Sequence, residues 1–115
     1  MKTGLRLKLA AASLLVASGL FAQTSLNVTL ADQLTISGAQ TLANVCGYTT
    51  SNGNEYALLG AEDGMIIVDI TVPTNVVQIV QIPMVNSLWK EIKVYQNYAY
   101  VTTEGSGGAL QIVDL

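Results

Sequence analysis

Beyond Ser25, the chain consists of short runs rich in Val, Ile, Leu, Thr and Tyr, separated by clusters of Gly and Asn. Within these runs apolar and polar residues alternate with a period of two, which is typical of half-buried β-strands. No apolar period of 3.6 residues persists over ten positions, so the pattern does not support a helix. The hydrophobic pattern therefore predicts an all-β fold.

The runs and the turn signals between them give a series of predicted strands. Asn52-Gly53 is a hairpin signal because both residue types tolerate positive φ, and Glu62-Asp63-Gly64 marks a second tight turn. Pro73 and Pro83 interrupt the pattern because proline has no amide hydrogen for a ladder. A short strand is predicted at Leu34–Ser37, and the main strands are 43–49, 55–61, 65–70, 76–82, 89–95, 98–103 and 110–115. Hairpin spacing of this kind indicates antiparallel sheet.

Two segments of the chain are similar to two later segments. Glu55–Leu59 resembles Asn97–Val101 at an offset of 42 residues (98 − 56), and Ile67–Ile70 resembles Ile112–Leu115 at an offset of 45 (114 − 69). The longer Gly-rich hairpin in the second copy accounts for the difference. A period of roughly 40–50 residues with about four strands per unit is typical of a β-propeller blade.

The repeat predicts antiparallel four-stranded blades of a β-propeller. Residues 43–82 supply one blade and residues 89–115 supply three strands of the next, so the sequence holds nearly two blades. Because propellers close with about four to eight blades, we expect this to be part of a longer propeller. A self-contained small β-sandwich is the competing hypothesis.

The motifs also resemble a known family. Val45-Cys46-Gly47-Tyr48 and Gly53–Gly60 are similar to the opening of the bacterial choice-of-anchor B proteins, and 89–95 and 97–104 are similar to that family's next block. Ile67–Ile70 and Gln111–Leu115 look like its LVIVD repeats. The resemblance covers roughly residues 34–115. The sequence departs from the family at Cys46, where Trp is usual, and at Val72 and Val76-Val77, where an Asp-Pro…Asn-Pro-Val loop is usual.

This resemblance implies a secreted, β-propeller-like protein of the kind common in Bacteroidota, often ending in a surface anchor. It supplies no catalytic residue. The N-terminus agrees with secretion: three basic residues precede the apolar stretch Leu9–Leu20 and small residues follow it, which is the layout of a signal peptide. We predict a signal peptide at 1–22, a lead-in segment at 23–42 and the incomplete repeat region at 43–115. An uncleaved membrane anchor is the alternative for the first segment.

Removing the signal peptide changes the charge of the chain. The remainder keeps two lysines against eight acidic residues, a formal net charge of −6 (2 − 8). A surface of this charge repels phosphate backbones, so we predict no nucleic-acid partner. We also predict no stable membrane span once the signal peptide is removed.

Few residues suited to catalysis are present. The absence of histidine excludes Ser-His-Asp and Cys-His arrangements and imidazole metal sites from this sequence. Cys46, the single cysteine, is interpreted as a small buried residue. Asp69 and Asp114 occupy equivalent strand ends, and Asx-type turns are favoured there over a Ca²⁺ site. We predict no catalytic residue, metal or cofactor.

Trp89 and Tyr95 are the only candidate ligand-binding residues. They share one strand face with Glu91 and Lys93, while Ile92 and Val94 point toward the predicted core. The two aromatic rings either stack on a sugar or pack against a neighbouring blade. The leading functional hypothesis is a secreted or cell-surface, non-enzymatic binding or adhesion module with an unknown protein or glycan ligand. The alternative is an extracellular propeller hydrolase whose catalytic residues lie in other blades.

Overall fold

The computed structural model describes residues 26–38 and 41–115. This part of the chain is all-β and holds seven strands: β1 (Leu42–Thr49), β2 (Glu55–Ala61), β3 (Gly64–Asp69), β4 (Val77–Pro83), β5 (Lys90–Tyr95), β6 (Tyr98–Thr103) and β7 (Gln111–Asp114). The predicted main strands are confirmed to within one residue at each end. The predicted signal peptide at 1–22 lies outside the described residues.

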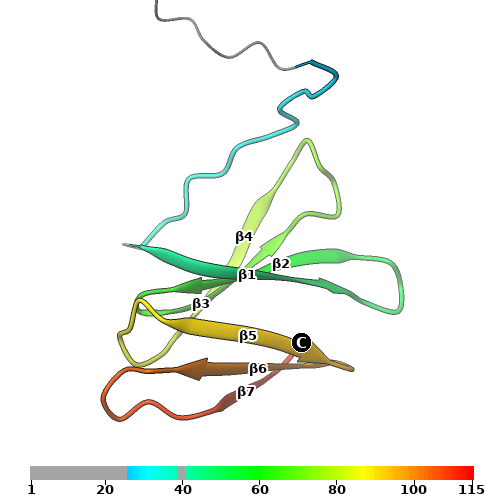
Figure 1. The fold of residues 1–115 in the computed structure, drawn as a ribbon. Coiled ribbons are helices and arrows are strands. Elements are labelled where there is room, and N and C mark those ends of the chain that lie inside the picture. The colour runs from blue at the N-terminus through cyan, green and yellow to red at the C-terminus, as the bar shows by residue number, and fades with distance from the viewer. Residues whose placement is uncertain (1–25, 39–40) are drawn as a thin grey trace, which may run out of the picture.

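The strands form two antiparallel meanders, shown one above the other in Figure 1. The first sheet has the order β1-β2-β3-β4, and the second sheet has the order β5-β6-β7. Neighbours in sequence are therefore neighbours in space, as expected for strands joined by hairpins. The arrangement agrees with the predicted propeller-like blades.

The hairpins follow from the local sequence. At the β1–β2 turn, the Thr50 hydroxyl accepts a hydrogen bond from the Asn54 amide at 3.0 Å, and the Gly53 amide donates to the Thr50 carbonyl. Gly53 alone takes a left-handed φ, of 90°, so the Asn52-Gly53 signal gives the predicted hairpin through a wider turn than a two-residue one. Glu62 and Asp63 close β2 and β3 directly, because Ala61 pairs with Gly64.

The sheets stack through one continuous hydrophobic core. Its fully buried members come from both sheets: Leu58 and Met65 from the first, and Ile92, Ala99 and Val101 from the second. We call the side of the first sheet that meets this core its front face, and the opposite side its back face. In the second sheet, the side that meets this core is the back face. The prediction that Ile92 and Val94 point into a core between blades is confirmed.

The lead-in segment covers part of the back face of the first sheet, over β2 and β3. Leu34 and Ile36 pack against a second cluster whose buried members are Ala61, Ile66 and Val68. The first sheet thus buries residues on both of its faces, although Val45 on β1 stays 65% exposed, whereas a sheet in a two-layer sandwich buries only one face. This difference favours a stack of blades over the sandwich.

The predicted strand at Leu34–Ser37 is wrong. These residues form no strand and pair with none of the strands among the described residues. The Ser37 amide donates instead to the Gln78 side chain at 3.0 Å, and the Val76 amide donates to Asp32 at 2.9 Å. The apolar side chains of the segment are therefore used for packing on a sheet face, and its backbone adds no strand to an edge.

Within residues 26–38 and 41–115, no helix has the length and apolar character needed to cross a membrane.

Candidate functional site

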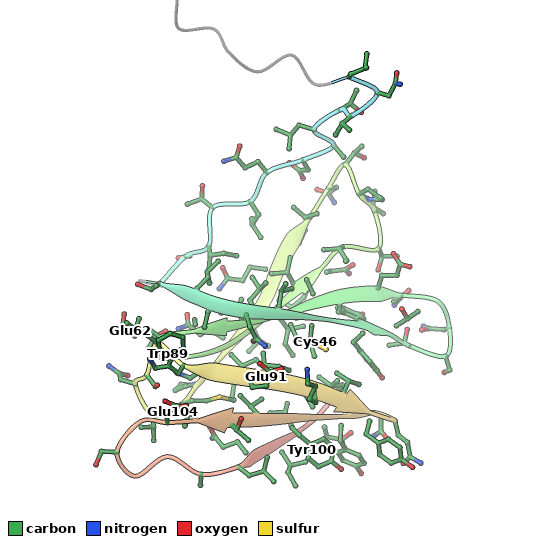
Figure 2. The ribbon with its side chains drawn as sticks, viewed as in Figure 1. Cys46, Glu62, Trp89, Glu91, Tyr100 and Glu104 are labelled. Atoms are coloured by element: carbon green, nitrogen blue, oxygen red, sulfur yellow. The ribbon has the colours of Figure 1, made fainter. Side chains whose placement is uncertain are left out.

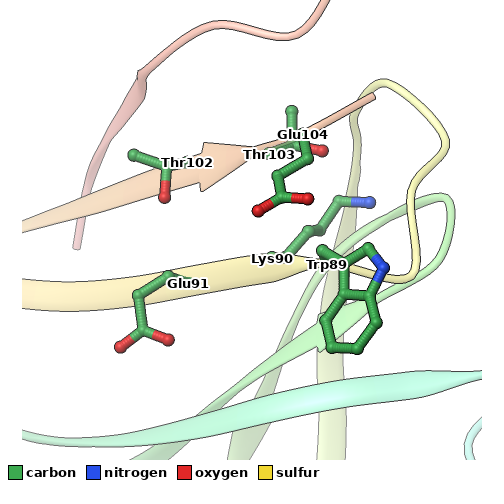
Figure 3. A pocket seen from close by; sticks show the side chains of 6 residues that line it. All are labelled: Trp89, Lys90, Glu91, Thr102, Thr103 and Glu104. Carbon is green, nitrogen blue, oxygen red and sulfur yellow. The ribbon is translucent and has the colours of Figure 1, made fainter. Parts of the chain in front are cut away.

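A pocket of about 250 Å³ lies where β5 begins and β6 ends. Its walls come from two adjacent strands and the residues that flank them: Trp89, Lys90, Glu91, Thr102, Thr103 and Glu104. The strand pairing explains this grouping, because Glu91 lies opposite Thr102 and Lys90 lies opposite Thr103. Figure 3 shows Trp89 and Glu91 on the β5 side of the hairpin and Glu104 on the β6 side.

The Trp89 backbone is fixed at both of its polar atoms. Its amide donates to the Ser87 hydroxyl at 3.1 Å, and its carbonyl accepts from the Glu104 amide at 3.3 Å. The indole itself remains 71% exposed. A large aromatic surface is thus held open to solvent on a well-anchored backbone, which is the geometry a stacking platform requires.

Lys90 forms the floor next to Trp89 and is only 5% exposed. Its ammonium donates to the carbonyl oxygens of Glu62, at 2.6 Å, and Ser87, at 3.1 Å. Burial lowers the pKa of Lys90, and the nearby carboxylates of Asp63 and Glu62 act in the opposite direction. Lys90 thus ties the β2–β3 turn of the first sheet to the segment that leads into Trp89.

The remaining polar groups on the rim are acceptors and hydroxyls. Glu91 forms a 2.6 Å ion pair with Lys93 and accepts a hydrogen bond from the Asn44 amide group at 3.2 Å. The hydrogen bond and charge of Lys93 lower the pKa of Glu91, while the same contact raises the pKa of Lys93. The ionised form of Glu91 is therefore favoured, and its carboxylate is a hydrogen-bond acceptor in the wall of the pocket.

The structure separates the two predicted ligand-binding residues. Trp89 lines the pocket, whereas Tyr95 lies at the opposite end of β5 and is 66% exposed. At about 3.3 Å of rise per residue, six residues place them roughly 20 Å apart. They do not form one platform, so only Trp89 belongs to this site.

Thr102 and Thr103 are pocket residues that the sequence pattern did not single out. A signal for them was present in the turn at Gln96-Asn97. In a hairpin with a two-residue turn, each residue before the turn pairs with the residue at the same distance after it. This rule needs only the position of the turn, and it places Thr102 opposite Glu91, as the observed register does. What it does not give is the open space above that pair.

The Asx-turn interpretation of Asp69 is confirmed. Its carboxylate accepts a hydrogen bond from the Thr71 amide at 2.8 Å, and the Thr71 side chain and amide together lower the pKa of Asp69. At the equivalent strand end, Asp114 accepts a 2.7 Å hydrogen bond from the Asn97 side chain. No group of three potential metal-ligating side chains occurs in the described part of the chain.

The residues that line the pocket all lie within the segment that matches a known family model. Residues 89–115 match the family model of the LVIVD repeat. The matched LVIVD repeat coincides with the second sheet, β5–β7, together with Trp89. No curated protein and no solved structure matches the chain.

Proposed function

We propose that this chain is the N-terminal part of a secreted or cell-surface protein of the choice-of-anchor B type, and that it binds a glycan without transforming it. The matched LVIVD repeat and the paired blade-like sheets support a propeller-type repeat. The basic, apolar and small residues of the first 22 positions support export. The proposed binding activity depends on Trp89, because it is a largely exposed aromatic ring beside hydrogen-bonding groups.

The polar groups of the pocket suit sugar hydroxyls. Stacking of a pyranose ring on the indole of Trp89 removes apolar surface from water, and the carboxylates of Glu91 and Glu104 accept hydrogen bonds from hydroxyl groups. Glu91 is paired with Lys93, so Glu104 is the pocket carboxylate without an ion pair among the described residues. Neutral sugars and amino sugars therefore fit best, because their hydroxyl and ammonium groups donate to Glu104, whereas a uronic or sulfated sugar brings a second negative charge beside it.

Trp89 is the only tryptophan in the chain, so tryptophan fluorescence reports directly on this pocket. We expect neutral or amino-sugar oligosaccharides to quench or blue-shift the emission in a saturable manner, and sulfated oligosaccharides to have no effect. In calorimetric titrations, Trp89→Ala should weaken binding by about two- to tenfold, the stacking contribution of one aromatic ring. Tyr95→Ala is the matched control and should leave the affinity unchanged.

Two results would refute the proposal. A panel of neutral, amino and anionic glycans that leaves the Trp89 emission unchanged would exclude a sugar-binding pocket here. Chromatographic detection of cleaved products after incubation with a bound glycan would show that the protein is an enzyme, and the hydrolase alternative would then replace the binding module. Signal-peptide cleavage is tested separately, by sequencing the N-terminus of the exported protein.

A further inference from the structure

The negative charges around the Trp89 pocket are only partly balanced by the protein itself. The described part of the chain contains two basic side chains, Lys90 and Lys93. The Lys90 ammonium is buried and donates to two backbone carbonyl oxygens. The Lys93 ammonium forms a 2.6 Å ion pair with Glu91. Among the described residues, neither cation is left to pair with Glu104, the second carboxylate in the wall of the pocket.

Glu104 lies directly across the hairpin from Trp89. The Glu104 amide donates to the Trp89 carbonyl at 3.3 Å, which extends the ladder by one pair beyond Lys90 and Thr103. The side chains of two residues paired in this way lie on the same face of the sheet, with their Cβ atoms about 5 Å apart. Figure 3 shows the Glu104 side chain pointing from the β6 side toward β5. The carboxylate is therefore a close neighbour of the exposed indole.

Alternation along the two strands adds two more side chains to this face. Glu91 lies two residues after Trp89, and Thr102 lies two residues before Glu104, so all four side chains point to the same side of the sheet. Figure 2 shows Trp89, Glu91 and Glu104 at one end of the second sheet. This face of the pocket thus combines one aromatic ring, two carboxylates and one hydroxyl group.

A cation on the ligand would complete this arrangement. An ammonium group is attracted both by the negative face of an indole and by an adjacent carboxylate. Amino sugars carry the ammonium directly on the pyranose ring, so a ring that stacks on Trp89 holds the ammonium within reach of Glu104. We infer that this pocket selects amino sugars with a free ammonium group over the same sugars in N-acetylated form, and that Glu104 determines this preference. This inference rests on the proposed glycan binding.

A lysine side chain of a peptide offers the same charge on a flexible stem. Fixing that stem costs conformational entropy, whereas the ammonium of an amino sugar is held in place by the ring that stacks on the indole. The Thr102 hydroxyl and the Glu91 carboxylate also match the hydroxyl groups of a sugar and have no counterpart on an aliphatic stem. The amino sugar is therefore the better fit to this pocket.

The test compares two ligands that share their rings and hydroxyl groups and differ at the amino group. Trp89 emission of the full chain is titrated with a β-1,4-linked glucosamine tetramer and with its N-acetylated counterpart, at about pH 5.5, where carboxylates and the amino groups of glucosamine are charged. We expect the glucosamine tetramer to bind about three- to tenfold more tightly at low salt. Raising the salt from about 0.01 M to about 1 M shortens the Debye length from about 30 Å to about 3 Å and should reduce this preference.

Glu104→Gln nearly preserves the size of the side chain and removes its charge. It should reduce the preference for the glucosamine tetramer by about two- to fivefold and leave the affinity for the N-acetylated tetramer within about twofold of the wild type. Glu55→Gln is the matched control, because it makes the same change at an exposed residue at the start of β2, at the opposite end of that strand from the turn that contacts Lys90. It should leave the preference unchanged.

Equal affinity for the two tetramers would overturn the inference and leave the proposed glycan binding intact. A preference that survives Glu104→Gln, or that Glu55→Gln removes to the same extent, would show that Glu104 does not determine it. A tetralysine peptide that competes with the glucosamine tetramer at equal affinity would overturn the assignment to amino sugars. If neither tetramer changes the Trp89 emission, the proposed glycan binding is itself refuted and the inference fails with it.

Discussion

Leu58→Ala should destabilise the protein far more than Ile112→Ala, which changes an exposed side chain of the second sheet. Leu58 is fully buried between the two sheets, beside Met65 and Ile92. Removing three carbon groups at about 0.8 kcal/mol each, together with the cavity left behind, lowers the free energy of unfolding by about 3 kcal/mol. The matched control is Ile112→Ala, which removes almost the same volume from a side chain that is 57% exposed and should cost about 1 kcal/mol.

Urea denaturation followed by circular dichroism measures both changes. With a denaturant slope of about 1.5 kcal/mol/M, the midpoint of Leu58→Ala should fall by about 2 M and that of Ile112→Ala by well under 1 M. Equal decreases in the free energy of unfolding for the two variants would refute the burial of Leu58 and the exposure of Ile112. A Leu58→Ala variant within about 1 kcal/mol of the wild type would show that the two sheets do not share a packed core.

Two further predictions concern the backbone and the pH dependence. Gly64→Ala should lower the free energy of unfolding by about 1–3 kcal/mol, because the added methyl group meets the Ile82 carbonyl oxygen. The control Gly47→Ala adds a methyl group in open space and should change that free energy by no more than about 0.5 kcal/mol. Thermal melts that rank the two variants in the opposite order would refute the packing of β3 against β4. Because hydrogen bonds from Thr71 lower the pKa of Asp69 below 3.8, its carboxylate stabilises the folded state above that pH and ceases to do so as the pH falls through its lowered pKa. Asp69→Asn should therefore flatten the decrease in stability below about pH 4 in acid titrations, and an unchanged acid limb would exclude this contribution.

The buried ammonium of Lys90 fixes the segments on either side of the pocket floor. Lys90 takes a position whose neighbours along β5 in the core, Ile92 and Val94, are apolar. Its ammonium is satisfied by the carbonyls of Glu62 and Ser87, which belong to two different connecting segments. A buried cation with two fixed acceptors specifies a geometry, because moving either segment would leave the charge without its partners. Trp89 directly precedes this anchor, and its own backbone hydrogen bonds to Ser87 and Glu104 hold it there.

Alternation of side chains along single segments was sufficient to predict the strands, their antiparallel pairing and the repeat. Strand formation depends on neighbours one and two residues away, and hairpin pairing depends on the turn between adjacent strands, so both are readable locally. The same reasoning identified Ile92 and Val94 as core residues and Asp69 as an Asx-turn residue. It failed at Leu34–Ser37, where an apolar alternation packs on a sheet face without joining a ladder.

The tertiary structure alone decided what lies against each face. Sequence analysis counts Lys90 only as one of two lysines and Trp89 as a possible stacking or packing ring, whereas stacking of the sheets buries Lys90 and leaves Trp89 in the wall of a pocket. Equivalent residues of the two repeats, such as Ile67 and Ile112, have the same local pattern but different surroundings. Their burial depends on contacts between residues that are distant in the chain, and such contacts leave no local signal in the alternation of side chains.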